Sequence, residues 1–365
     1  MYKQCIYGFL LLFVSIQTMG QQSTTKDSVI KIMNKVAIWQ IGEFEKGKVT
    51  IPKTNWENGA LYTGMVALHH IVEKKEYRDF LYSIGEGNKW DLGPVRLFAD
   101  DYCVAQMYTQ LYMKYKDPKM IEKWIALADT IVARPFNEPL MATQKNINHR
   151  EWAWCDALFM GPPSLAYLST AKNDLRYLNK ADSLWWKTSA YLYDKDEHLF
   201  YRDSHFFTRK EANGQKIFWS RGNGWVMAGL VRMMNNMSKN FKNKKKYVKQ
   251  YKEMANRIIT LQQTDGSWHA SLLDPITFAD KETSGTGFYC YALTWGINNG
   301  LLSAKKYRPI VEKAWQALVS SVHPDGKLGY VQKVGSGPIA TSYDTTNVYG
   351  VGAFLLAGSE LYKMK

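Results

Sequence analysis

The pattern of apolar and polar positions divides the chain into two alternating kinds of helical segment. Six segments open with polar, tryptophan or glycine residues and continue as stretches that are apolar and rich in small residues on every face, which is typical of buried helices. They recur at intervals of roughly 45 to 65 residues, so each interval behaves as one repeated unit. These six segments begin near Trp56, Asp101, Trp154, Arg221, Ser284 and Thr345.

The segments between them are amphipathic, with one apolar stripe and one polar face. Residues 117–134 are the clearest case, because Asp117 can cap a helix and Pro118 suits the first helical position. Runs of alternating β-branched residues are scarce, so we expect few strands. Further amphipathic helices are predicted over residues 24–42, 75–84, 174–192, 244–263 and 305–321.

Alternating buried and amphipathic helices, about twelve in all, predict an all-α fold with an inner and an outer ring, the (α/α)6 barrel. Parallel inner helices would place their polar N-terminal openings at one end, where helix dipoles and free amide groups favour an anion. The long polar and aromatic loops 136–150, 194–218 and 265–283 would form the wall of that end. An α-solenoid or a helical bundle used only for binding is the alternative architecture.

The N-terminal residues predict export. Lys3 precedes an apolar stretch, and small residues stand three and one positions before Gln21. The apolar stretch is shorter than the roughly 20 residues of a membrane span, so we expect no membrane anchor. We therefore predict a signal peptide at residues 1–20, a single barrel domain at residues 21–365, and a secreted or periplasmic protein.

Charge and cysteine content narrow the class of ligand. The formal net charge of +14 fits an anionic ligand. The densest basic run, residues 239–252, has helical spacing and is interpreted as a solvated outer face; no nucleic-acid-binding motif accompanies it, so we expect no nucleic acid partner. Beyond the predicted signal peptide, Cys103, Cys155 and Cys290 form no CxxC pair, which argues against a disulfide framework and a zinc site.

Asp156 is the strongest candidate for catalysis. It lies in the apolar and aromatic stretch WAWCDALFM, where a carboxyl with a raised pKa can stay protonated near neutral pH and donate a proton. Asp100 and Asp101 can supply a neighbouring carboxylate that raises this pKa further. They differ by about 100° in helical direction, so we expect one to face the cavity and choose Asp101, with Asp100 as a helix cap. A helix cap or structural salt bridge is the alternative role for Asp156.

Arg221 and four tryptophans are candidates for binding a sugar acid. Arg221 lies in the stretch FWSRGNGWV, where the glycines permit close backbone approach and the guanidinium fork can bind a carboxylate. Tryptophans near the starts of the buried segments could form a platform for sugar faces, although each could also be a core residue. These are Trp56, Trp154, Trp219 and Trp225.

Residues of the predicted loops complete the candidate set. His149 and His205 could contact a ligand, and Arg202, in the stretch LFYRDSH, is a further candidate for substrate binding. The histidines are isolated or directly adjacent and do not have metal-ligand spacing, so we expect no metal site. The chain also lacks a GxSxG motif, a P-loop and a dinucleotide fingerprint.

At these residues the chain resembles the unsaturated glucuronyl and rhamnogalacturonyl hydrolases of glycoside hydrolase families 88 and 105. The resemblance runs over nearly the whole chain after the predicted signal peptide, and four motifs carry it: WAWCDALFMGPP, FWSRGNGWV, DGSWHASLLDP and ETSGTGFYCYAL. It implies an (α/α)6 barrel that removes a 4,5-unsaturated uronic acid from lyase-cut acidic oligosaccharides. It also implies that neither a metal nor an organic cofactor takes part.

The resemblance implies roles for particular residues. The residue matching Asp156 protonates C4 of the C4=C5 double bond and then activates water to attack C5, and a second aspartate, matching Asp101 or Asp100, assists. Many relatives carry a His where this chain reads LFYRDSH, so rhamnogalacturonan, ulvan-type and glycosaminoglycan fragments all stay open as substrates. The residues that match the uronate-binding positions are Trp154, Trp219, Arg221 and Trp225.

Two other functions stay open at this point. A conventional inverting glycosidase on the same barrel would cleave saturated glycosides and need two carboxylates on opposite faces of the sugar. A sugar-binding protein without catalytic activity would bind uronides, and loss of Asp156 would change no reaction.

Overall fold

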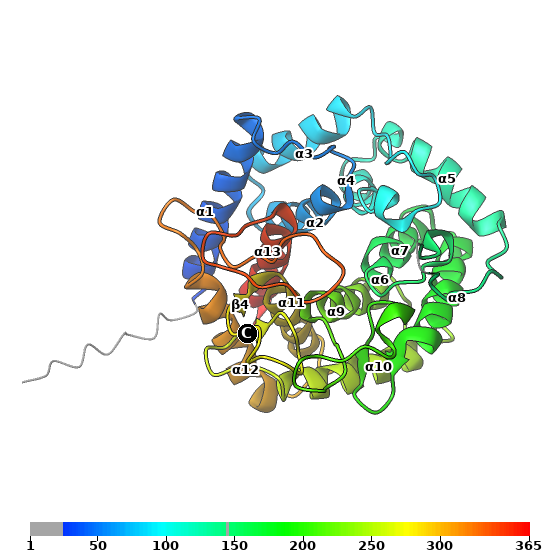
Figure 1. Ribbon diagram of the computed structural model, residues 1–365. Helices are drawn as coiled ribbons and strands as arrows, with labels where there is room; N and C mark the ends of the chain where they lie inside the picture. Colours follow the sequence, from blue (N-terminus) through cyan, green and yellow to red (C-terminus); the bar gives the residue numbers. More distant parts are fainter. Residues whose placement is uncertain (1–24, 144–145) are drawn as a thin grey trace, which may run out of the picture.

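The computed structural model describes residues 25–143 and 146–365, and the predicted signal peptide at residues 1–20 lies outside them. Within these ranges the chain forms thirteen α-helices and four two-residue strands. Figure 1 shows the helices in two concentric layers. The inner helices are α2 (Trp56–Val72), α4 (Ala105–Tyr115), α6 (Ala157–Met160), α7 (Pro162–Lys172), α9 (Ser220–Asn235), α11 (Thr283–Asn298) and α13 (Val348–Lys363). The outer helices are α1 (Lys26–Glu45), α3 (Lys75–Gly87), α5 (Glu122–Ala133), α8 (Leu175–Leu192), α10 (Lys244–Ile259) and α12 (Ala304–Val319).

The inner helices pack side by side in a closed cycle. Helix α2 contacts α4, α4 contacts α7, α7 contacts α9, α9 contacts α11, α11 contacts α13, and α13 returns to α2. The outer helices cover this cycle: α1 lies on α13, α3 on α2, α8 on α7, α10 on α9 and α12 on α11, while α5 packs against α8. The predicted alternation of inner and outer helices is confirmed, and the fold is a double ring of helices.

Burial in each layer follows the sequence pattern. In α11 every residue from Thr283 to Gly296 is buried, whereas α3 buries one apolar stripe that includes Phe80 and Ile84. Inner helices α2 and α13 approach so closely that a Cβ atom on Gly64 would overlap the carbonyl oxygen of Gly352. Small residues in the inner segments therefore allow neighbouring backbones to meet along the ring.

One predicted outer helix is interrupted. Asp117 accepts a hydrogen bond from the N–H of Lys119 and caps the 3-10 helix η2 (Pro118–Met120), as its position before a proline suggests. Ile121 then adopts a φ of −127° and separates η2 from α5. The predicted segment 117–134 is thus a 3-10 turn followed by an α-helix, because its first turn closes on Pro118 with a hydrogen bond from the N–H of Ile121.

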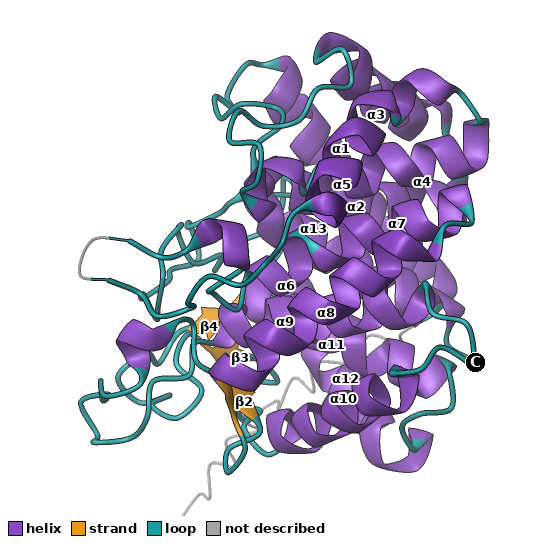
Figure 2. Ribbon diagram, turned by 90° about the vertical axis from the view of Figure 1, so that its right-hand side faces the viewer, coloured by secondary structure: helices purple, strands orange, loops and turns teal. Residues whose placement is uncertain are grey.

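The long loops gather at the end of the double ring where the inner helices begin (Figure 2), whereas the C-terminus lies at the other end. Two short antiparallel hairpins lie among these loops, which agrees with the expectation of few strands. Strand β1 (Tyr193–Asp194) pairs with β2 (Leu199–Phe200), and β3 (Trp268–His269) pairs with β4 (Lys281–Glu282). The three predicted loops and a fourth, between α12 and α13, surround this end.

Other expectations from the sequence can be placed on the helices. The three cysteines after the predicted signal peptide are buried and free. In the basic run, Lys245, Lys246 and Lys249 are exposed on α10 while Tyr247 is buried, so the run forms a solvated outer face. Across the part of the chain that the structure describes, no helix has the length and apolar character that a membrane crossing requires.

Candidate active site

Asp156 lies directly before the short inner helix α6, at the loop-rich end of the double ring. Its side chain is 13% exposed, and Nε of Arg202 is 3.6 Å from its Oδ2. The N–H of Cys155 donates to the carbonyl of Arg202 at 2.8 Å, which fixes the two segments together. Burial raises the pKa of Asp156, and the positive charges of Arg202 and Arg221 partly oppose this rise. The carboxyl can therefore hold a proton while one side stays accessible.

Asp100 and Asp101 lie in the 3-10 helix η1 (Ala99–Tyr102), just before α4. The carboxylate of Asp101 turns to the preceding loop and accepts a hydrogen bond from the N–H of Val95. Oδ1 of Asp100 is buried, with no hydrogen-bond partner among the described residues. Burial raises the pKa of Asp100, and so does the nearby carboxylate of Asp156. The structure thus places Asp100 next to Asp156, whereas the sequence analysis had favoured Asp101 as the residue that faces the cavity.

Arg202 connects Asp156 to a second acidic residue. Its Nη1 donates to Oδ2 of Asp203 at 2.7 Å, and Asp203 is 1% exposed. Oδ1 of Asp203 accepts the N–H of His205 at 2.9 Å and lies 2.8 Å from Nδ1 of the same residue. Nε2 of His205 is 2.9 Å from the carbonyl oxygen of Thr143. His205 thus forms a bridge between two loops, and its contact with a ligand stays a prediction.

Arg221 is fully buried at the beginning of α9. Its Nη1 and Nη2 donate to the carbonyl oxygens of Gln332 at 2.9 Å and Lys333 at 3.1 Å. Its guanidinium lies between the rings of Trp219 and Tyr349, at 4.4 Å and 4.7 Å from their centroids. The guanidinium of Arg221, which the sequence suggested as a binder of a sugar carboxylate, therefore binds the loop before α13. Its positive charge still lowers the pKa of Asp156.

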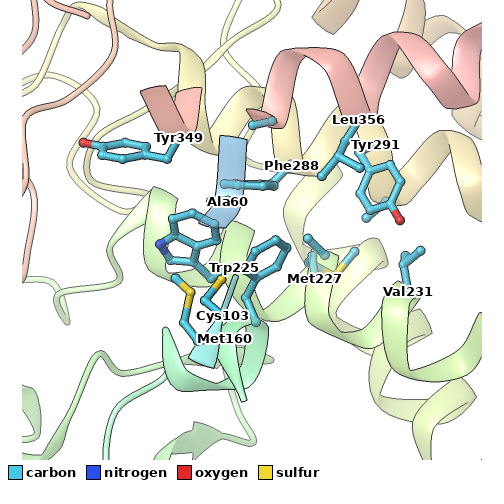
Figure 3. Close-up of a cluster of buried hydrophobic side chains, with 14 of the residues drawn as sticks. Ala60, Cys103, Met160, Trp225, Met227, Val231, Phe288, Tyr291, Tyr349 and Leu356 are labelled. Carbon is cyan, nitrogen blue, oxygen red and sulfur yellow. The ribbon is translucent and has the colours of Figure 1, made fainter. Parts of the chain in front are cut away.

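Two of the four predicted platform tryptophans are interior residues. Trp225 is completely buried between Phe159 and Phe288, at centroid distances of 4.8 Å and 4.3 Å. Figure 3 shows Trp225 beside Phe288. Trp219 is 2% exposed, and its Nε1 donates to Oε1 of Gln332 at 3.0 Å. Both lie near the beginning of the inner helix α9, as predicted. Their rings pack beneath the site and expose little surface on which a sugar could stack.

Of the other two tryptophans, Trp56 lies closer to solvent, whereas Trp154 is buried. Trp56 is half-buried and stacks on Tyr349 at 5.4 Å with an angle of 23° between the rings. Trp154 is 2% exposed and lies against Phe98 at 5.5 Å and His149 at 5.2 Å. His149 has one side exposed to solvent, while partial burial of its ring against Phe98 and Trp154, together with the charge of Arg202, lowers its pKa. Phe98, His149 and Trp154 thus form an aromatic wall next to Asp156.

Three residues of this site were not singled out from the sequence. Asp203 directly follows Arg202 in LFYRDSH, and an acid beside a base between aromatic residues was the available signal. Tyr349 lies in the last buried segment and stacks on Trp56, while Phe98 precedes the aspartate pair. The contacts of Tyr349 and Phe98 join separate repeats, so no local pattern indicates these two residues.

The site thus combines a proton-holding carboxyl, a neighbouring carboxylate and a largely buried arginine beside an aromatic wall. In the described ranges, His, Cys, Asp and Glu form no group of three or more that could hold a metal ion. Residues 26–365 match the family model of Glycosyl Hydrolase Family 88. The chain belongs to glycoside hydrolase family 88.

Curated relatives of this family 88 hydrolase extend over almost its full length. An unsaturated 3S-rhamnoglycuronyl hydrolase from Formosa agariphila is 36% identical over 363 residues, covering 96% of this chain and 95% of the relative. A protein of the same name from Alteromonas sp. strain LOR is 32% identical, covering 93% of this chain and 86% of the relative. A solved family 88 structure from Bacteroides vulgatus, 28% identical, superposes with a TM-score of 0.82 over 93% of this chain and 99% of that one.

Proposed function

We propose that this family 88 hydrolase removes a 4,5-unsaturated uronic acid from the non-reducing end of rhamnose-containing oligosaccharides made by polysaccharide lyases. The observation that carries the proposal is the carboxyl of Asp156, whose pKa is raised by burial and which lies in a site shared with Asp100 and Arg202. Such a carboxyl can donate a proton to carbon and then, once ionised, accept a proton from water. The names of the two curated relatives support the substrate class.

The proposed reaction uses one carboxyl as acid and then as base. Asp156 protonates C4 of the C4=C5 double bond, which leaves positive charge shared between C5 and the ring oxygen. The resulting carboxylate of Asp156 takes a proton from water as the water oxygen attacks C5. The hemiketal opens to a ketone at C5, and the hemiacetal left at C1 collapses and expels the neighbouring sugar. A conventional inverting glycosidase would instead need two carboxylates flanking the bond.

We assign the assisting carboxylate to Asp100 in place of Asp101. The unpartnered Oδ1 of Asp100 and its interaction with Asp156 support this choice, whereas the carboxylate of Asp101 already binds the N–H of Val95. The interaction between the two carboxyl groups disfavours two negative charges at once, so the pair keeps a proton before the reaction.

We assign Arg202 to the carboxylate of the substrate. Its guanidinium is largely buried next to Asp156 and is held from behind by Asp203 at 2.7 Å. A cation in this position attracts the uronate and stabilises Asp156 after it has lost its proton. Asp203 acts through Arg202 and is a positioning residue.

We propose rhamnose carrying a 3-sulfate as the leaving sugar, because both curated relatives are named for a 3S-rhamnoglycuronyl unit. The rim is suited to a sulfate, since exposed Arg209 and Lys333 lie on loops at the open end. Products of an ulvan-type lyase are therefore the first substrates to test. Rhamnogalacturonan and glycosaminoglycan fragments are the comparison substrates.

We further propose that the double ring is a single (α/α)6 barrel over residues 21–365 and that residues 1–20 are a cleaved export signal. The closed cycle of inner helices and the family 88 structural neighbour support the barrel. N-terminal sequencing of the protein from its native host tests the cleavage. A mature chain that begins at Met1 would contradict it.

The activity is tested with purified protein and unsaturated disaccharides from each class of lyase. Hydrolysis removes the conjugated double bond, so its ultraviolet absorbance should fall with ulvan-type disaccharides, and the released sugar should be a sulfated rhamnose by mass spectrometry. Loss of absorbance with another class only would contradict the proposed leaving sugar. No loss with any class, together with cleavage of a saturated glycoside, would support the conventional glycosidase.

A further inference from the structure

A cavity of about 480 Å³ opens at the end of the double ring opposite to Asp156. Helices α2, α4, α7, α9, α11 and α13 all contribute side chains toward their C-terminal ends, so the cavity lies on the axis of the ring. Its volume is in the range of small-molecule sites. Among its described lining residues, His70, Lys114, Arg232 and Lys363 are basic and Glu360 is acidic.

Arg232 is held rigidly in the wall of this cavity. Its side chain is 2% exposed, and its Nε donates to Oε1 of Gln106 at 2.6 Å. Nε2 of Gln106 donates to the carbonyl of Phe159 at 2.9 Å, which fixes the orientation of the amide. The guanidinium also lies 4.9 Å from the ring centroid of Tyr167. These contacts fix the guanidinium in place before any ligand arrives.

The charge of Arg232 has no acidic partner in the described part of the chain. Its Nη2 is buried without a hydrogen-bond partner, and no carboxylate oxygen lies within 4 Å of the guanidinium. The acidic lining residue, Glu360, is engaged by Lys363 at 2.8 Å and by Asn298 at 2.9 Å. Burying a cation that has an unused hydrogen-bond donor costs free energy of folding unless an anion binds to it.

The rim of the cavity also carries cations, of which Lys114 is paired with Glu73 and Lys363 with Glu360. His70 has its pKa lowered to about 4 by burial and by the charges of Lys114, His69 and Lys363, against a smaller opposite effect of Glu73. The C-terminal ends of the inner helices favour a cation here, which stabilises Arg232 but does not attract an anion. Attraction for an anion must therefore come from the guanidinium and the neighbouring side chains.

The cavity is separate from the active site. Arg232 follows Arg221 by 11 positions on α9, which is about 16 Å along the helix axis. Figure 3 shows buried side chains between the two ends, from Trp225 near the active site to Val231 and Tyr291 near the cavity. A ligand in the cavity therefore does not touch Asp156.

We propose that this cavity binds a small organic or inorganic anion through a carboxylate or sulfate group, with Arg232 as the anchor. Tyr167, Tyr291 and Asn235 line the same space and offer hydrogen bonds to hydroxyl groups of an acidic sugar. This inference does not rest on the proposed reaction, because neither Asp156 nor an unsaturated substrate takes part in it.

Histidine side chains at the two ends of the ring allow a direct test. The ring signals of the full folded protein are followed by NMR during titration with potassium sulfate and with glucuronate, at constant ionic strength maintained with chloride. We expect a saturable shift of the His70 signal, whereas His149 reports any binding at the active site. Glucose is the neutral control and should leave His70 unchanged.

Two variants test whether the shift of the His70 signal depends on Arg232. Arg232→Gln removes the charge and should abolish the saturable shift of His70. Asn235→Asp adds a negative charge at an exposed position of the lining and should weaken binding about fivefold or more. The Asn235→Asp variant alone tests the role of Arg232 if Arg232→Gln does not fold.

The outcomes separate the possible ligands. Saturation by both sulfate and glucuronate supports a general oxyanion site, and saturation by glucuronate alone supports a site for an acidic sugar. The absence of a saturable shift with either anion would overturn the proposal. Equal affinity in the wild type and in Asn235→Asp would also overturn it.

Discussion

Arg202 and Arg232 are largely buried arginines at opposite ends of the double ring, and their partners differ. Arg202 lies between two carboxylates, Asp156 at 3.6 Å and Asp203 at 2.7 Å. Arg232 contacts the neutral amide of Gln106 at 2.6 Å and no carboxylate within 4 Å among the described residues. The first cation changes the protonation of a neighbouring acid, whereas the second keeps a donor free. The partners of a buried arginine thus indicate its role better than its burial does.

The largest expected difference between the two ends comes from removing each cation. Arg202→Gln should lower kcat/KM by about 100-fold, which is typical for loss of a charged group that stabilises a transition state. Because Arg202 lowers the pKa of Asp156, its removal should raise that pKa. The protonated acid then persists to higher pH, so the alkaline limb of the pH profile of kcat/KM should move upward.

Arg232→Gln is the matched control for this experiment. We expect its kcat/KM to stay within about twofold of the wild type and its alkaline limb to stay in place, because Arg232 is about 16 Å along α9 from the active-site end. A downward movement of the limb in Arg202→Gln, or the same movement in both variants, would contradict the distinction between the two arginines.

The neighbouring aspartates Asp100 and Asp101 should also behave differently. Asp100→Asn should lower kcat/KM by about 30-fold, or about 2 kcal/mol in activation free energy. Asp101→Asn should retain most activity, because its amide oxygen can still accept the N–H of Val95. Steady-state kinetics of the two variants measures this difference. A lower kcat/KM for Asp101→Asn than for Asp100→Asn would contradict the assignment.

Stability should change in the opposite direction to activity at Asp100. Burial raises the pKa of Asp100 in the folded state, so its ionised form opposes folding at neutral pH and this cost disappears as the pH falls below the unfolded value. Asp100→Asn should therefore raise the unfolding free energy at pH 7 by about 1 kcal/mol. Thermal unfolding near pH 3.5 should show no such gain, and a gain of equal size there would contradict the explanation.

A substitution at Asp203 tests whether the effect of Arg202 on the reaction depends on its hydrogen bond with Asp203. Asp203→Asn keeps the shape of the side chain but removes the charge that offsets Arg202, so we expect a fall in kcat/KM of about tenfold. The less compensated cation should lower the pKa of Asp156 and move the alkaline limb downward, opposite to Arg202→Gln. Asp194→Asn is the control, because Asp194 is a partly buried aspartate that binds Lys216 at 2.6 Å in the β1–β2 hairpin. Equal pH profiles for the two variants would remove the positioning role from Asp203.

Trp56 should give the smallest effect. It is half-buried beside Tyr349, so Trp56→Ala should raise KM about fivefold with little change in kcat. Trp225→Phe is the comparison, because Trp225 lies in the core and should change thermal stability more than KM. A change in kcat alone for Trp56→Ala would argue against a contact with the sugar.

The fold was predictable because each layer has its own periodic signal. The all-apolar inner segments and striped outer segments predict twelve helix positions. The structure differs where Pro118 opens a 3-10 turn before α5 and where the third inner segment is divided into α6 and α7. The loop between α12 and α13 could not be predicted as part of the wall. It joins the site through long-range hydrogen bonds from Arg221 to the carbonyls of Gln332 and Lys333.

The site was predictable only in part. The chemistry of Asp156 follows from an acid in an aromatic stretch, but the choice between Asp100 and Asp101 depends on which one the Val95 loop binds. Likewise, FWSRGNGWV indicates an arginine at a helix start but not that carbonyls from another repeat occupy its fork. Contacts between repeats determine these roles, and a single sequence does not contain their geometry.

The central claim is that Asp156 hydrates an unsaturated uronide. The most direct test is to run the reaction in heavy water on an ulvan-type unsaturated disaccharide and to analyse the product by NMR, comparing wild type with Asp156→Asn. The account predicts deuterium at C4 of the released uronic acid in the wild type, and a rate lower by about 100-fold or more in the variant. A product that retains the C4=C5 double bond, or equal rates in the two proteins, would contradict it.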